Sequence, residues 1–181
     1  MQGSTPLHWA CASFHGDVAE YLLDQPRINP LARNKDGLHA LMLALRELGE
    51  GEAPDQGLPI LELFHRKAPQ ALDMPGGERG EPEVLRSEFG GTEPANEHEL
   101  DHPGLRPIHI AALNGHVRCL EFLLGLGIDP NTRIRRRITA LHAAATEGHV
   151  GCVKALLDAG ANLGAADVKV RELPCAGLEL S

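Results

Sequence analysis

The sequence predicts an all-α solenoid, a protein built from stacked helix–turn–helix units, because one pattern occurs three times. The segments His8–His15, His109–His116 and His142–His149 each begin and end with histidine. A Leu-Leu pair follows 14 residues after the first histidine of each segment, and the last two segments start 33 residues apart. A fixed period of this length is typical of proteins whose repeats stack in a row.

We expect each unit to begin with a short helix. Thr5 and Thr139 can supply N-cap oxygens, and Pro6 suits the first helical position because an N–H would have no partner there. Gly115 and Gly148 end the first helix of the last two units, at a position that favours positive φ.

A second helix should follow, with apolar residues at helical spacing. In the last two units these residues are Cys119, Leu120, Leu123 and Leu124, and then Cys152, Val153, Leu156 and Leu157. Gly127 and Gly160 close the second helix and direct the chain into a turn. Because so short a unit cannot bury its own apolar face, the neighbouring units must supply the core.

The segments Thr5–Ala10 and Thr139–Ala144 carry the sequences TPLHWA and TALHAA. They resemble the signature of the ankyrin repeat, and the resemblance covers most of residues 3–164. It implies a solenoid of stacked helix–turn–helix units with β-hairpin fingers. It also implies that the first histidine of each repeat forms hydrogen bonds locally and with the adjoining repeat.

The predicted organisation follows this resemblance. Residues 3–36 form repeat 1, residues 37–72 a degenerate repeat 2, residues 104–136 repeat 3 and residues 137–164 repeat 4, before an irregular tail at 165–181. In repeat 2, Met42 replaces the motif histidine, Pro59 is expected to open the second helix, and we expect this repeat to be the least stable. Residues 73–103 form an acidic, Gly- and Pro-rich insert that we expect to be disordered. An eroded repeat around Glu83–Phe89 is the alternative for that segment.

Composition limits the function. A net charge of −8 argues against nucleic-acid binding, which needs concentrated Lys and Arg, and 3% aromatic residues suit thin layers between short helices. The sequence contains neither a signal-peptide core nor an apolar run of about 18 residues. We therefore expect a protein of the cytoplasm, with the nucleus as a second location, and no membrane contact. We also expect a monomer. The four cysteines contain no C-x-x-C pair and are expected to be reduced.

The ten histidines do not predict a metal site, because the two members of each pair are expected on different helices. The sequence also lacks the G-x-S-x-G, H-E-x-x-H and phosphate-loop motifs. We therefore expect no metal, no cofactor and no enzymatic activity.

The resemblance implies that partner proteins bind at the finger tips and at the ends of the first helices. The basic run Arg133–Arg137 favours a solvated turn, with a patch for an acidic peptide or for the chain's own acidic insert as the alternative, and Arg137 takes the place of a turn glycine. Asn131 is a candidate for hydroxylation, although a turn-forming role is favoured. The predicted partner-binding residues are Lys35, Asp36, Arg46, Glu47, His102, Leu105, Leu113, Asn114, Arg133, Arg135, Arg136, Ile138, Thr146 and Glu147.

The predicted function is a non-catalytic scaffold that binds another protein on the concave surface of the stack. Two alternatives stay open. In the first alternative, the chain is the substrate-recognition part of a larger ubiquitin-ligase adaptor or ankyrin-bearing enzyme. In the second, it is a truncated isoform without independent function. Both ends of the sequence suggest a piece of a longer array, because Met1–Gly3 lead straight into the first motif and residues 172–175 do not match it.

Overall fold

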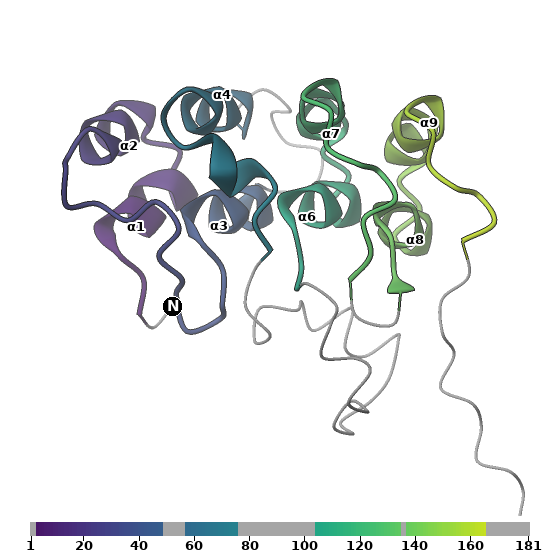
Figure 1. The fold of residues 1–181 in the computed structure, drawn as a ribbon, viewed down its shortest axis with the longest axis horizontal. Helices are drawn as coiled ribbons and strands as arrows, with labels where there is room; N and C mark the ends of the chain where they lie inside the picture. Colours follow the sequence, from purple (N-terminus) through teal and green to yellow (C-terminus); the bar gives the residue numbers. More distant parts are fainter. Residues whose placement is uncertain (1–2, 49–56, 76–103, 135–136, 166–181) are drawn as a thin grey trace, which may run out of the picture.

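A computed structural model describes residues 3–48, 57–75, 104–134 and 137–165. Within them, α1 (Pro6–Ala12) and α2 (Gly16–Leu23) form the first helix pair, and α3 (Ala40–Glu47) and α4 (Gly57–Lys67) the second, followed by the 3₁₀ helix η1 (Pro69–Leu72). The third pair is α6 (Pro107–Leu113) with α7 (Val117–Gly125), and the fourth is α8 (Ala140–Thr146) with α9 (Val150–Asp158). The first helices form one row and the second helices another (Figure 1). This arrangement confirms the predicted all-α solenoid.

The first helices begin where the motif places them. The backbone N–H of Thr5 donates to His8 Nδ1 at 3.1 Å, and the Thr5 hydroxyl lies 2.8 Å from the same nitrogen. Because Nδ1 accepts, Nε2 carries the ring proton and donates to the Leu38 carbonyl at 3.0 Å, in the next repeat. Thr139 and His142 repeat the local part of this arrangement, at 3.3 and 2.8 Å.

The turns between the two helices of a repeat need positive φ. Gly115 and Gly148 adopt φ values of 73° and 75°, whereas Phe14 holds the same position in repeat 1 at 54°. A second substitution of this kind occurs before the first helices, where Gly37 has φ 78° and Arg137 has φ 62°. Two side chains therefore occupy a backbone conformation that glycine adopts with less strain.

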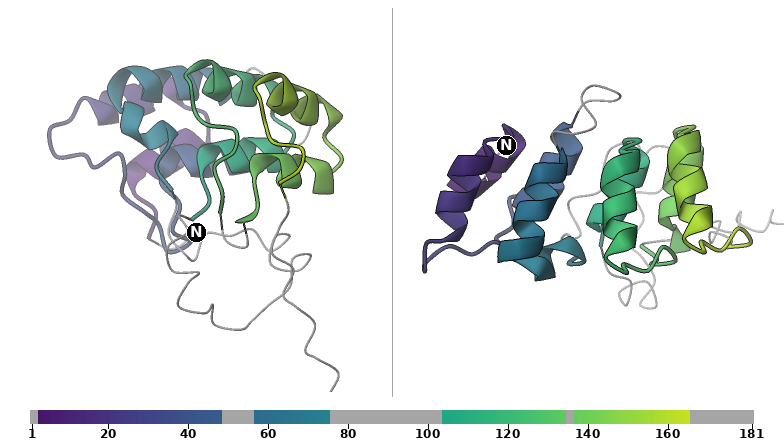
Figure 2. Two further views of the ribbon diagram at one scale, coloured as in Figure 1. Left: turned by 45° about the vertical axis from the view of Figure 1, so that its right-hand side comes forward. Right: turned by 90° about the horizontal axis from the view of Figure 1, so that it is seen from above.

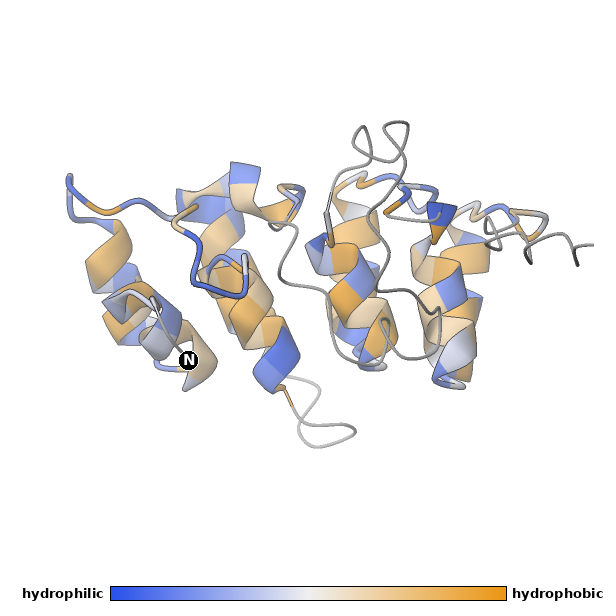
Figure 3. Cartoon of the chain, turned by 90° about the horizontal axis from the view of Figure 1, so that it is seen from below, coloured by the Kyte–Doolittle hydropathy of each residue, from blue (hydrophilic) through white to orange (hydrophobic). Residues whose placement is uncertain are grey.

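The core runs through the stack between successive repeats. First helices pack on first helices (α1 on α3, α3 on α6, α6 on α8), and second helices pack on second helices in the same order. Figure 2, seen from above, shows the four pairs side by side, and Figure 3 shows apolar and polar residues alternating along the helices. Every residue of α6 is buried, because this helix has neighbours on both sides.

The β-hairpin fingers remain a prediction, since the described residues contain no regular strand. The two turns described at the finger positions are closed by backbone hydrogen bonds of 2.9 Å, from Asn34 N–H to the Leu38 carbonyl and from Ile134 N–H to the Ile138 carbonyl. The Asn34 side chain reinforces its turn, because its oxygen accepts from the N–H groups of Asp36 and Leu38, both at 3.0 Å. The turn at residues 34–38 is therefore tight.

Repeat 2 forms a complete helix pair although its motif is incomplete. Its second helix starts at Gly57, two residues before the expected Pro59. A Cβ on Gly57 would lie 2.5 Å from a Leu48 methyl group and 2.8 Å from the Cys119 sulfur of repeat 3, so a larger residue here would require these side chains to shift. Because α3 packs on α6 and α4 on α7, repeats 2 and 3 are direct neighbours in the stack.

Two arginines donate hydrogen bonds to residues that lie just before the segment 76–103. The Arg106 guanidinium, just before α6, donates to the carbonyl and the carboxylate of Asp73, which follows η1. Arg33 donates to the Pro75 carbonyl at 2.8 Å. The residues on either side of this segment are thus held together. No helix among the described residues has the length and apolar character needed to cross a membrane.

Candidate protein-binding surface

The motif histidines are structural. His8 links Thr5 to Leu38 of the next repeat, as described above, and His109 Nε2 lies 3.2 Å from the Thr132 carbonyl. His109 Nδ1 has no partner because Arg106 stands where a threonine would be. These contacts confirm the local and inter-repeat bonding that the resemblance implied for His8.

The second histidine of the motif also joins repeats, which sequence reasoning did not foresee. His116 Nε2 lies 3.0 Å from the Leu45 carbonyl at the end of α3, and His149 Nε2 lies 2.9 Å from the Leu113 carbonyl at the end of α6. The identical spacing of these histidines in the motif is the sequence feature that could have predicted this role. His142, in the last described repeat, bonds only within its own repeat.

Burial keeps several of these rings neutral. Desolvation lowers the pKa of His109 to about 4, although the Thr132 carbonyl opposes the shift. Desolvation also lowers the pKa of His39 to about 4, while the Met74 backbone opposes it and Arg33 adds to it. His39 replaces the N-cap threonine of repeat 2, and its buried ring nitrogens have no well-formed hydrogen bond with described residues.

Three predicted binding residues are wrong because their side chains lie in the core. Leu105 is 1% exposed, Ile138 4% and Leu113 6%. Leu105 and Ile138 stand at the same position of the repeat as Leu38, which is also buried. Leu113 ends α6, which is buried along its whole length.

Four other predicted residues lie on the finger before α3 and at the end of α3. Arg46 extends from the end of α3 toward the finger, with Nη1 3.7 Å from Asp36 Oδ2. Its Nη2 and Nε atoms lie 3.2 and 3.3 Å from Glu47 Oε1. Lys35 is exposed beside Asp36. We call Lys35, Asp36, Arg46 and Glu47 the charged patch.

The remaining predicted residues are dispersed. Asn114 donates to the Leu45 carbonyl at 3.1 Å, and the Thr146 hydroxyl donates to the His142 carbonyl at 2.9 Å, so both side chains serve the fold. Glu147 and Arg133 are half-buried. His102, Arg135 and Arg136 lie outside the described residues.

Asn131 is a structural residue of the turn after α7. Its Nδ2 donates to the Gly160 carbonyl at 3.2 Å, and its Oδ1 accepts from the Asn162 N–H at 2.7 Å, both in repeat 4. The turn-forming role that the sequence favoured is present. Hydroxylation of Asn131 stays a prediction.

The described cysteines Cys11, Cys119 and Cys152 are buried and free. Burial raises the pKa of Cys11 to about 12 and that of Cys119 and Cys152 to about 11, so these thiols are poor nucleophiles. Within the described ranges, no three His, Cys, Asp or Glu side chains gather in a way that could hold a metal ion.

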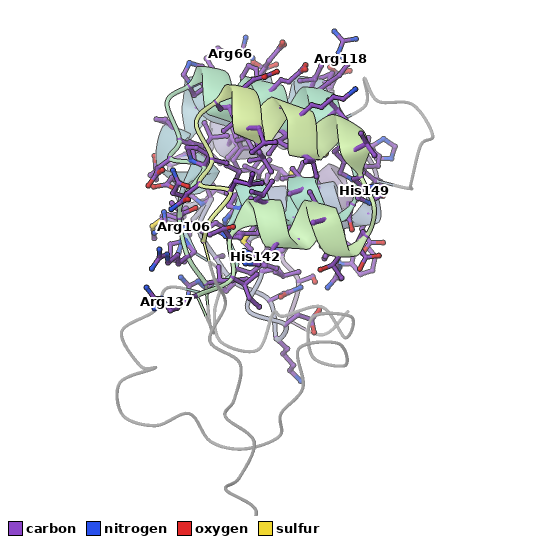
Figure 4. The ribbon with its side chains drawn as sticks, turned by 90° about the vertical axis from the view of Figure 1, so that its right-hand side faces the viewer. Arg66, Arg106, Arg118, Arg137, His142 and His149 are labelled. Carbon is purple, nitrogen blue, oxygen red and sulfur yellow. The ribbon has the colours of Figure 1, made fainter. Side chains whose placement is uncertain are left out.

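Charges on the second-helix row were also missed. Arg66 of α4 binds Glu20 of α2 at 2.7 Å, and Lys67 binds Asp24. Seen along the stack from the α8 and α9 end, Arg66 and Arg118 lie beside the second helices, whereas Arg106 and Arg137 lie on the side of the inter-repeat turns (Figure 4). Local sequence patterns cannot predict such ion pairs, because the two partners lie more than 40 positions apart.

The fold and this surface define a helical repeat protein in which His8, His116 and His149 join neighbouring repeats and the charged side chains lie on the outer rows. The chain belongs to the ankyrin-repeat family. A model of the ankyrin repeat matches residues 2–35, and a model of ankyrin repeats in three copies matches residues 78–167. Neither match includes residues 37–72, where the structure nevertheless has α3 and α4. The second match begins inside the segment for which the sequence left an eroded repeat open.

Among curated proteins, the chain is similar to the "Probable E3 ubiquitin-protein ligase XBOS32" of Oryza sativa subsp. japonica. The two are 30% identical over 160 residues, which make up 68% of this chain and 31% of the relative. The chain thus spans about a third of the length of that protein. Ankyrin-repeat domains are in general non-catalytic modules for protein–protein interaction.

Proposed function

We propose that the chain is a non-catalytic recognition module that binds a segment of another protein on the first-helix row, centred on the charged patch. The observation that carries this proposal is the position of Arg46, which spans from α3 to the finger residue Asp36. It is the place where predicted binding residues of a finger and of a first helix meet. No cofactor enters the proposal.

The ion pairs within the charged patch can be exchanged for ion pairs with a partner protein. The side chains of Asp36, Arg46 and Glu47 are 46%, 32% and 35% exposed, so their ion pairs are screened by water and contribute about 0–1 kcal/mol. Such pairs separate at little cost. A partner segment that carries charged side chains can then replace them, with the guanidinium already held in position.

A photo-crosslinking experiment tests the proposal. A p-benzoylphenylalanine residue replaces Glu47 on the first-helix row or, as a control, the exposed Glu62 of α4 on the second-helix row. Proteins captured from position 47 and not from position 62 are identified and purified. Arg46→Glu should weaken their binding by about tenfold or more, whereas Lys154→Glu on α9 should leave it unchanged. Equal capture at both positions, or binding indifferent to Arg46→Glu, contradicts the proposal.

A second candidate is favoured by the similarity to a probable ubiquitin ligase. In this version, the bound segment belongs to a protein that becomes ubiquitylated. The crosslinked partner should then be less ubiquitylated in cells that express Arg46→Glu than in cells that express the unchanged chain. Equal ubiquitylation in both rejects the ligase context and leaves the recognition module standing.

The alternative of a truncated isoform without its own function is tested by a thermal melt. A cooperative transition followed by circular dichroism indicates a folded scaffold, whereas a stranded fragment loses its helices gradually.

A further inference from the structure

Two of the described residues other than glycine have positive φ, and packing compensates for only one of them. Phe14 has φ 54° and its ring packs against the core, whereas Arg137 has φ 62° and an exposed side chain. Backbone strain of this kind occurs mainly at positions where the side chain has a function. The packing of its ring gives a reason for Phe14, but Arg137 needs a different one.

The turn does not require an arginine at position 137. Two backbone hydrogen bonds close the turn at residues 134–138, one donated by Ile134 at 2.9 Å and one donated by Arg137 at 3.0 Å. The turn at residues 34–38 has the same two bonds at the same lengths, with Gly37 at the position of Arg137. Glycine therefore closes this turn without strain, and the fold gives no reason for an arginine.

The turn holds two arginine side chains on a firm base. Ile134 and Ile138 are 2% and 4% exposed, so the core anchors both ends of the turn. Arg133 directly precedes this base, and Arg137 lies within it, on the side of the inter-repeat turns (Figure 4). Because the backbone is already ordered, these side chains can bind a ligand with a small loss of backbone freedom.

The charge of this turn selects the kind of ligand. Four of the five residues 133–137 are arginine, and guanidinium groups bind carboxylates through paired N–H···O bonds. The chain as a whole carries a net charge of −8, which repels a long polyanion such as a nucleic acid. A short acidic peptide segment meets mainly the local positive charge.

We propose that Arg133 and Arg137 form a binding site for an acidic segment of a partner protein. The backbone strain at Arg137 is then the cost of placing a guanidinium group at this point of the turn. The sequence alone favoured a solvated turn, and the strain is the observation that favours the alternative. The site lies between repeats 3 and 4 and does not rest on the charged patch of repeat 2.

Fluorescence anisotropy with the full chain tests the proposal. The probe is a labelled peptide of alternating glutamate and serine, and the same peptide with glutamine in place of glutamate is its control. We expect only the glutamate peptide to bind, and its affinity should fall by about tenfold or more between about 50 and 500 mM salt.

Two variants separate binding from folding. Arg133→Ser should weaken binding of the glutamate peptide by about threefold or more. Arg137→Gly should weaken it by a similar factor and also raise the melting temperature by about 1–4 °C, because glycine relieves the strain. A merely structural role for Arg137 would not move affinity and stability in opposite directions. Arg118→Ser on α7, on the second-helix row, is the matched control and should bind the peptide normally (Figure 4).

Two further measurements test other occupants of the site. A single-stranded oligonucleotide should bind more weakly than the glutamate peptide. A full-chain variant in which the glutamates of residues 81–99 are changed to glutamine should bind the peptide with unchanged affinity. The proposal is overturned if the peptide does not bind, if Arg137→Gly keeps full affinity, if the oligonucleotide binds more tightly, or if the glutamine variant gains about tenfold, which would indicate that the chain's own insert occupies the site.

Discussion

Repeat 2 is more completely buried than repeat 4, although repeat 4 matches the ankyrin motif better. Repeat 4 has the Thr and His of the signature, yet Val150, Leu157 and Leu163 are exposed. Repeat 2 lacks both, and every residue of α3 from Ala40 to Leu45 is buried, as are Ile60, Leu61 and Phe64 of α4. The structure thus shows that the burial of a repeat depends on having neighbours on both sides and on large apolar side chains. The motif supplies helix caps and hydrogen bonds between repeats, which is a smaller contribution.

The largest expected effect is on the core of repeat 2. Phe64 is fully buried, and Phe64→Ala should lower the free energy of unfolding by about 3–5 kcal/mol, because it leaves a cavity between α4 and its neighbours. Leu157→Ala in repeat 4 should cost less than about 1 kcal/mol. Urea denaturation followed by circular dichroism measures both. Equal losses of unfolding free energy in the two variants would contradict this difference between the repeats. They would support the sequence-based expectation that repeat 2 is the least stable.

Acid should destabilise the protein through the interior repeats. The pKa of His39 and of His109 is about 4 in the folded chain, and about 6.5 when the chain is unfolded. Between these values the unfolded chain binds more protons, so stability is present above pH 6.5 and falls as the pH decreases toward 4, by roughly 3 kcal/mol for each ring. His39→Thr should make the unfolding free energy less dependent on pH in this range. An unchanged dependence would mean that His39 takes up a proton as readily folded as unfolded.

A smaller effect separates the two kinds of histidine. His116 bridges repeats 2 and 3, so His116→Ala leaves the Leu45 carbonyl without this donor and should cost about 1–2 kcal/mol. His142 bonds only within its own repeat, and His142→Ala should cost less. Thermal melts of the two variants rank them. This order is the reverse of what the motif alone suggests, and a larger loss for His142→Ala would restore the motif-based order.

The smallest effect concerns the two residues with positive φ. Arg137 is exposed, so Arg137→Gly relieves strain without losing contacts and should stabilise the chain by about 0.5–1 kcal/mol. The Phe14 ring packs partly against the core, so Phe14→Gly gains less or nothing. Chemical denaturation of both variants checks this. If Phe14→Gly stabilises more than Arg137→Gly, the ring contributes no packing.

The sequence predicted the features that local chemistry controls. Thr5 and Thr139 cap helices, Gly115 and Gly148 end them with positive φ, and Cys119 and Cys152 are buried at equivalent positions. Each of these follows from a residue's own backbone preference or from helical spacing.

What the sequence did not predict depends on neighbours across the stack. The positions of Leu105 and Ile138 look exposed in an isolated repeat, and they become buried only when another repeat lies beside them. The carbonyl acceptors of His116 and His149 lie 71 and 36 residues earlier in the chain, beyond any local pattern. Of the candidate site, the residues of the charged patch stay a prediction, whereas the side chains of Leu105, Leu113 and Ile138 are buried.

The bond between Arg106 and Asp73 also bears on how this chain can change in length. It joins residues 33 positions apart, at the point where repeat 2 meets repeat 3. Together with the packing of α3 on α6 and of α4 on α7, this bond holds repeats 2 and 3 together through residues on either side of the segment 76–103. A tag or a second domain inserted between residues 76 and 103 should therefore leave the contact between these two repeats in place.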